Sequence, residues 1–95
     1  MIIDFSKIGK ISKDLKIKKK KLVLSHGTFD YFHYGHLRHL EECKNQGDIL
    51  IVSITADKFI NKSPHSPMFN ENKRAKILDS LNVVDYIVIS PFSDA

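Results

Sequence analysis

Two histidines lie three residues apart around a glycine, as His33, Gly35 and His36. They follow an apolar run at residues 22–24 and a glycine-bearing turn, and they precede a stretch of helical periodicity. A turn from a strand into a helix is a natural anion site, because N-terminal N–H groups point at the ligand and the helix dipole favours negative charge. Imidazoles at such a turn suit a phosphoryl group whose oxygens gain charge in the transition state. The segment therefore indicates phosphate chemistry on a nucleotide.

The elements that must position these histidines alternate between strands and helices. Strands are expected where apolar and β-branched residues run together, as in buried parallel strands. These stretches are residues 21–25, 48–55 and 84–90. Helices are expected where apolar residues recur every three or four positions. These stretches are residues 4–15, 35–46 and 71–81, with Asn70 placed to cap the last and a proline-containing loop at 58–69. The alternation predicts an α/β fold, a Rossmann-like parallel sheet with flanking helices.

Length and composition narrow the class of protein. Ninety-five residues suffice for one small domain. The single cysteine, Cys43, excludes an internal disulfide, and its helical spacing from Leu40 suits a packed hydrophobe better than a nucleophile. No apolar run is long enough for a membrane helix, and Asp4 interrupts the apolar start of the chain where a signal peptide would continue. A cytoplasmic location is therefore expected.

Much of the net charge of +4 lies in a lysine cluster at residues 16–21, directly ahead of the first expected strand. Nucleic-acid binding is one interpretation of this cluster, but no aromatic residues are interleaved with the lysines. A solvated turn is the simpler interpretation. We therefore expect neither a nucleic-acid partner nor a membrane partner. Residues 1–20 are expected to form a basic leader with a short amphipathic helix, and residues 21–95 the domain itself.

The motif around the histidines resembles a known signature. Gly27-Thr28-Phe29-Asp30 followed by His33-Tyr34-Gly35-His36 is similar to the GTFD…HxGH signature of the cytidylyltransferase-like nucleotidyltransferases. That family includes glycerol-3-phosphate and ethanolamine-phosphate cytidylyltransferases and the nucleotidyltransferase domain of ADP-heptose synthases. The similarity continues in the family's order and spacing over about residues 21–90. It is carried by residues 37–42, 47–52, 55–59, 61–62, 69–71, 74–75 and 84–86.

The resemblance implies the HxGH nucleotidyltransferase fold and its reaction. In that reaction a phosphate oxygen of the acceptor attacks the α-phosphorus of CTP or ATP, and pyrophosphate leaves. His33 and His36 would hold the triphosphate and stabilise the anionic transition state; the alternative is that one of them merely caps the turn. Gly35 would allow close approach of backbone or nucleotide. Mg²⁺ would arrive with the nucleotide.

Further residues of the motif receive roles by the same resemblance. Within the loop that begins at Gly27, Thr28 and Phe29 would offer backbone N–H groups to phosphate, and Asp30 would either hold the loop or help to place Mg²⁺. Two cations complete the expected site: Lys62 in the loop after the second strand and Arg74 on the following helix. Each would neutralise pyrophosphate or anchor the incoming phosphate.

The spacing of the histidines raises the question of a metal site, which the sequence does not support. His33, His36 and His39 recur every three residues, but no carboxylate or cysteine pattern typical of zinc completes them. No protein-held metal is therefore expected. His26 and His39 are expected to pack or to support the site from behind.

The acceptor and the extent of the domain are the open points of the sequence. The loop at residues 62–67 departs from sugar-phosphate relatives, because His65 and Ser66 replace a glycine and an arginine. The acceptor is therefore left as a phosphorylated small molecule, such as a sugar phosphate or glycerol phosphate. Family members have further strands, so the domain is expected to be incomplete at its C-terminus. Homodimers are common in the family, although no residue here tests that, and a nucleotide-binding or scaffolding module without turnover is the alternative function.

Overall fold

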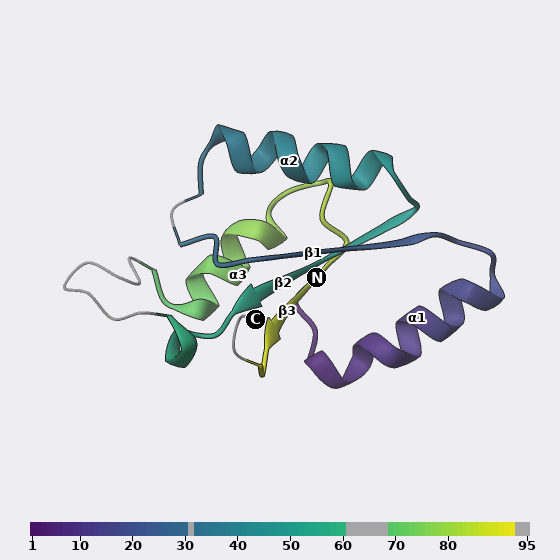
Figure 1. Ribbon diagram of the computed structural model, residues 1–95, viewed down its shortest axis with the longest axis horizontal. Coiled ribbons are helices and arrows are strands. Elements are labelled where there is room, and N and C mark those ends of the chain that lie inside the picture. Colours follow the sequence, from purple (N-terminus) through teal and green to yellow (C-terminus); the bar gives the residue numbers. More distant parts are fainter. Residues whose placement is uncertain (31, 61–68, 93–95) are drawn as a thin grey trace.

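The structure, a computed structural model, describes residues 1–30, 32–60 and 69–92. A parallel sheet forms its centre, with the strand order β1-β2-β3 (Figure 1). The strands are β1 (Leu22–Gly27), β2 (Ile49–Thr55) and β3 (Tyr86–Ser90). Helix α2 (Tyr34–Asn45) connects β1 to β2, and α3 (Glu71–Asp79) connects β2 to β3. The predicted Rossmann-like parallel sheet with flanking helices is thus confirmed.

The core lies between the sheet and these two helices. The central strand β2 is buried on both faces, because Leu50, Ile51, Val52 and Ile54 are all fully inaccessible. On one face its side chains pack with Leu40 of α2 and with Ala75 and Leu78 of α3, in one continuous cluster. A strand that lies between two neighbouring strands and two covering layers has no solvated face. This burial explains the continuous β-branched run in the sequence.

The first residues of the chain join the sheet, which the sequence did not predict. Ile2 forms a parallel bridge with Ile87 of β3, and the Met1 ammonium group pairs with Asp79 at 2.6 Å. The chain then passes through η1 (Phe5–Lys7) and α1 (Ile8–Ile17) to the start of β1. Helix α1 and helix α2 lie on opposite sides of the sheet in Figure 1.

Element bounds differ from the predicted ones by small amounts at the ends. The first helix begins as a 3-10 turn at Phe5 and continues to Ile17, and β1 runs two residues beyond its predicted end. A further short 3-10 helix, η2 (Asp57–Phe59), follows β2. Asn70 caps α3 as predicted, since its side-chain oxygen accepts the Lys73 N–H at 2.9 Å. None of the helices in the described ranges is long and apolar enough to cross a bilayer.

Candidate active site

The loop that follows β1 is strained. Phe29 has a φ of 51°, in the left-handed region that bulky residues rarely adopt. Its ring is buried and lies edge-on to His36, with ring centroids 5.3 Å apart. Gly27 is required beneath this ring, because an added Cβ would lie 2.8 Å from Phe29 Cε2. The surroundings therefore hold the loop in a conformation that its own backbone disfavours.

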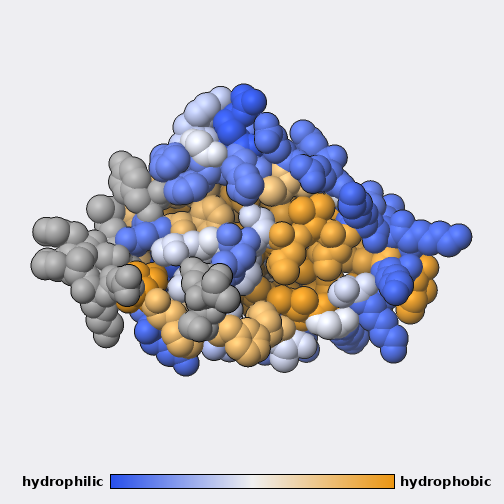
Figure 2. All heavy atoms as spheres, in the orientation of Figure 1, coloured by the Kyte–Doolittle hydropathy of each residue, from blue (hydrophilic) through white to orange (hydrophobic). Residues whose placement is uncertain are grey.

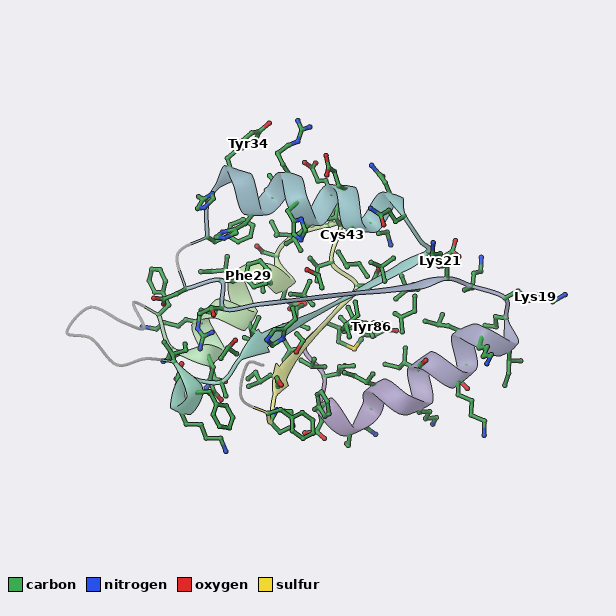
Figure 3. All side chains as sticks on the ribbon, in the orientation of Figure 1. Lys19, Lys21, Phe29, Tyr34, Cys43 and Tyr86 are labelled. Atoms are coloured by element: carbon green, nitrogen blue, oxygen red, sulfur yellow. The ribbon has the colours of Figure 1, made fainter. Side chains whose placement is uncertain are left out.

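The two histidines of the motif form one unit at the start of α2. His33 is the N-cap residue, and its Nδ1 accepts the Gly35 N–H at 3.0 Å. His36 reaches back one turn, and its Nδ1 accepts the His33 N–H at 3.3 Å. The two rings stack with centroids 4.0 Å apart (Figure 3 shows this end of α2 next to the labelled Tyr34). Capping by one histidine was the sequence's alternative to catalysis, and in the structure both rings share the cap.

This cap determines which nitrogen of each ring carries the proton. A backbone N–H can only donate, so Nδ1 of both His33 and His36 must be an unprotonated acceptor. In the neutral rings the proton therefore lies on Nε2. The pair presents two N–H donors from adjacent, stacked rings, which is a suitable arrangement for a dense cluster of phosphate oxygens.

The environment of His36 favours its neutral form. Partial burial, and then the charges of His33 and His39, lower its pKa from the ordinary 6.5. Phe29 and Phe32 also lie near the His36 ring, with centroids 5.3 and 5.6 Å distant. His36 is thus positioned as a neutral Nε2–H donor at neutral pH.

The anion site differs in one respect from the expected one. The sequence predicted backbone N–H groups of the helix start as the donors, but the Gly35 amide is already occupied by His33. Gly35 also leaves room for that ring, since an added Cβ would lie 2.8 Å from His33 Cε1. Thr28 and Phe29 keep their expected positions in the loop after β1, and no described hydrogen bond uses their N–H groups.

Arg74 lies in the interior of the domain. It is 1% exposed, the largest fully buried side chain among the described residues. Its Nη1 donates to the carbonyls of Thr28 and Thr55 at 2.8 and 2.7 Å, and its Nε donates to the Phe69 carbonyl at 3.1 Å. Its Nη2 forms an ion pair with Asp57 at 2.6 Å. In this structure the guanidinium joins the ends of β1, β2 and the segment before α3.

Two carboxylates of the site were given no role from the sequence. Asp57 pairs with Arg74, and Glu71 Oε1 accepts the Asp57 N–H at 2.9 Å. Asp30 has a similar task, because its Oδ1 accepts the Phe69 N–H at 3.1 Å. The available signal was the arginine itself, since a buried guanidinium needs a carboxylate and several carbonyls around it. Lys62 lies outside the described residues.

A cleft of about 460 Å³ opens at the same edge of the sheet, beyond the ends of β2 and β3. In open α/β sheets, ligands bind in the crevice outside the carboxyl ends of the strands. The cleft offers one cation, Lys58, and the carboxylates of Asp57 and Glu71. Its other lining residues are Ala56, Ile89, Ser90 and Pro91.

The described residues contain no group of three or more histidine, cysteine or carboxylate side chains that could hold a metal. Mg²⁺ keeps several waters and takes one or two carboxylates together with substrate phosphates. Asp30, for which the sequence offered such a partial role as one of two alternatives, accepts the Phe69 N–H with its Oδ1.

Comparison with known proteins agrees with this geometry. Residues 24–94 match the cytidylyltransferase-like family. The bifunctional protein HldE of a Nitratiruptor species is 41% identical over 93% of this chain, and that of Aliarcobacter butzleri is 41% identical over 90%. The chain spans only 20% and 18% of the length of these two relatives.

A solved structure gives the same result for the fold. The lipopolysaccharide core biosynthesis protein from Thermoplasma volcanium GSS1 superposes with a TM-score of 0.69 at 34% identity. The match covers 75% of this chain and 58% of that protein. The family match over residues 24–94 and the parallel sheet agree, and the chain therefore belongs to the cytidylyltransferase-like family.

Proposed function

We propose that the chain belongs to a nucleotidyltransferase that moves CMP or AMP from CTP or ATP to a phosphorylated small molecule, with release of pyrophosphate. The observation that carries this proposal is the stacked pair of His33 and His36, whose shared cap fixes both Nε2–H groups as donors. Membership of the cytidylyltransferase-like family supports the same reaction class.

The proposed chemistry is a direct displacement. A phosphate oxygen of the acceptor forms a bond to the α-phosphorus, the bond from that phosphorus to the bridging oxygen breaks, and pyrophosphate leaves with the electron pair. Mg²⁺ on the nucleotide would neutralise part of the triphosphate charge. His33 and His36 would donate Nε2–H bonds to the phosphate oxygens, which stabilises a transition state without any covalent intermediate. Their neutral form is sufficient for this task, because donation requires no net charge.

A polyhydroxylated acceptor fits the cleft beyond the ends of β2 and β3. Lys58 supplies a cation for its phosphate, and Asp57 and Glu71 supply carboxylate oxygens that accept hydrogen bonds from hydroxyl groups. Both carboxylates also bind within the protein, so they are held in fixed positions. A sugar phosphate therefore suits the cleft better than a phosphoalcohol with one hydroxyl. The name of the solved relative, a lipopolysaccharide core biosynthesis protein, supports the same acceptor class.

Pyrophosphate release by the full natural protein tests the proposal. The protein would receive CTP or ATP with Mg²⁺ and either phosphosugars or phosphoalcohols. His36→Ala should abolish release, whereas His39→Ala, an exposed histidine on the same helix, should leave it within a few-fold. Nucleotide binding without release for every acceptor would instead indicate a binding module without turnover.

A further inference from the structure

The charge of the chain is strongly segregated. Residues 7–21 contain eight lysines and one aspartate, whereas the whole chain has a net charge of only +4. The remaining residues are therefore net acidic. A basic segment on an acidic domain indicates an anionic partner for that segment.

The lysines are concentrated where α1 ends and the chain turns into β1. Lys19 adopts a φ of 58°, and its N–H donates to the Lys16 carbonyl at 3.1 Å. The Lys20 N–H donates to the Leu15 carbonyl at 2.8 Å, which completes a Schellman motif. Glycine usually occupies the left-handed position of this motif, because a side chain there is strained. Lysine at this position adds a charge at a cost in stability.

The side chains of this turn face solvent. Lys16 and Lys18–Lys21 are all exposed, and none forms a side-chain ion pair within the described ranges. Lys19 projects away from the body of the molecule (Figure 3). Ile17 lies among them and is 71% exposed. We call Lys16, Ile17 and Lys18–Lys21 the basic end.

An exposed apolar area adjoins the charges. Leu24, near the start of β1, is 58% exposed. Figure 2 shows an apolar area on this face, bordered by hydrophilic residues. Lysines around exposed aliphatic side chains are typical of surfaces that lie at a lipid interface, where the charges contact headgroups and the aliphatic groups enter the acyl boundary.

The basic end does not serve the nucleotide. The molecule extends 46 Å along its longest axis, and Lys19 and Tyr34 are labelled toward opposite ends of that axis in Figure 3. At physiological salt, exposed charges are screened beyond about 8 Å. The lysines therefore contribute little to the capture of a triphosphate at His33 and His36.

In contrast to the solvated turn without a membrane partner that the sequence favoured, we propose that the basic end docks the protein on an anionic lipid bilayer, with the lysines against the headgroups and Ile17 at the interface. A lipid surface is favoured over a nucleic acid because residues 7–21 contain neither arginine nor an aromatic residue. The docking is peripheral and reversible, since one exposed isoleucine is far too little for insertion. The inference does not depend on the proposed catalytic function.

Vesicle flotation of the full chain tests this proposal. Binding should appear with vesicles that contain phosphatidylglycerol, should be absent with phosphatidylcholine alone, and should fall as salt is added. Each lysine near the surface contributes about a fivefold factor, so Lys18→Gln with Lys20→Gln should weaken binding about thirtyfold. Lys73→Gln with Lys76→Gln removes the same charge from the exposed face of α3 and should have little effect.

The Lys19→Gly variant distinguishes an effect of charge on vesicle binding from an effect of stability. This variant should be more stable than the natural chain and yet bind the anionic vesicles about fivefold more weakly. Equal binding to neutral vesicles, an equal loss in the α3 control, or lysine-dependent binding to duplex DNA tighter than to vesicles would overturn the proposal.

Discussion

At the scale of single residues, the imidazoles of His33 and His36 use their two nitrogens for different tasks. Nδ1 of each ring accepts a backbone N–H and so completes the start of α2, which leaves Nε2–H for a ligand. Protonation of both rings would remove both acceptors and place two charges on rings 4.0 Å apart. The site and the helix terminus therefore depend on the same protonation state.

Acid should destabilise the fold through His36. Burial lowers the pKa of His36 from 6.5, so the folded chain binds fewer protons than the unfolded chain as the pH falls. This contribution to stability is fully present above the unfolded pKa of about 6.5 and is lost as pH falls through the folded value. Urea unfolding at about pH 8 and about pH 5 measures how far the free energy of unfolding decreases with acid. This decrease should be smaller for His36→Gln than for the natural chain. Identical decreases would contradict the argument.

Two glycines in helices offer a matched comparison. In a helix interior, Gly→Ala gains about 0.5–1 kcal/mol. Gly9→Ala in α1 should show that gain, because nothing lies within 4 Å of the added Cβ. Gly35→Ala should show no such gain in stability, since the added Cβ would displace the His33 ring. It should also weaken nucleotide binding at least tenfold. Thermal unfolding compares the stability of the two variants, and nucleotide titration compares their affinity. An equal gain in stability for both would exclude the proposed contact between a Cβ at position 35 and the His33 ring.

At the scale of elements, Arg74 joins the ends of two strands to the segment before α3. Its bond to the Thr28 carbonyl and the bond from Phe69 to Asp30 fix both sides of the strained Phe29. That residue in turn packs on His36. These internal bonds give Arg74 a positioning role in this structure, whereas its contact with phosphate stays a prediction.

A double-mutant cycle distinguishes the two roles of Arg74. Removing one partner of a buried ion pair costs about 3–5 kcal/mol, so Arg74→Met should destabilise the chain by roughly that amount. Asp57→Asn should be milder because Asp57 is 37% exposed, and it should leave the chain folded for assay. The two changes should be non-additive by about 0.5–3 kcal/mol in urea unfolding. If Arg74 instead serves phosphate, Asp57→Asn should release it and tighten nucleotide binding.

The periodicity of the sequence predicts these elements but not the connections between them. The run at residues 48–55 indicated the buried strand, and Asn70 indicated the start of α3, because both signals are local. The bridge from Ile2 to Ile87 and the partners of Arg74 could not be predicted, since they join residues far apart in sequence. The histidine pair was found through its motif, whereas the sharing of the cap depends on ring geometry that spacing does not determine.

At the scale of the whole molecule, the sheet is unequally protected at its two sides. Ile2 pairs with β3 on one side, whereas within the described ranges β1 pairs only with β2. An unpaired strand edge is a template for pairing with another chain, and an exposed aliphatic residue increases the tendency. Leu24 is such a residue, at 58% exposure on β1.

The 95-residue chain should therefore self-associate through β1. Light scattering should show a mean mass that rises with concentration, and Leu24→Lys should suppress the rise, because a charge on an edge strand disfavours edge pairing. Ile17→Lys is the control, since Ile17 is at least as exposed but lies on α1, outside the sheet. Equal suppression by both variants would assign the association to general hydrophobicity. Suppression by Leu24→Lys alone would identify β1 as the side of the sheet at which a second copy, or any further strand of a longer chain, adds to the fold.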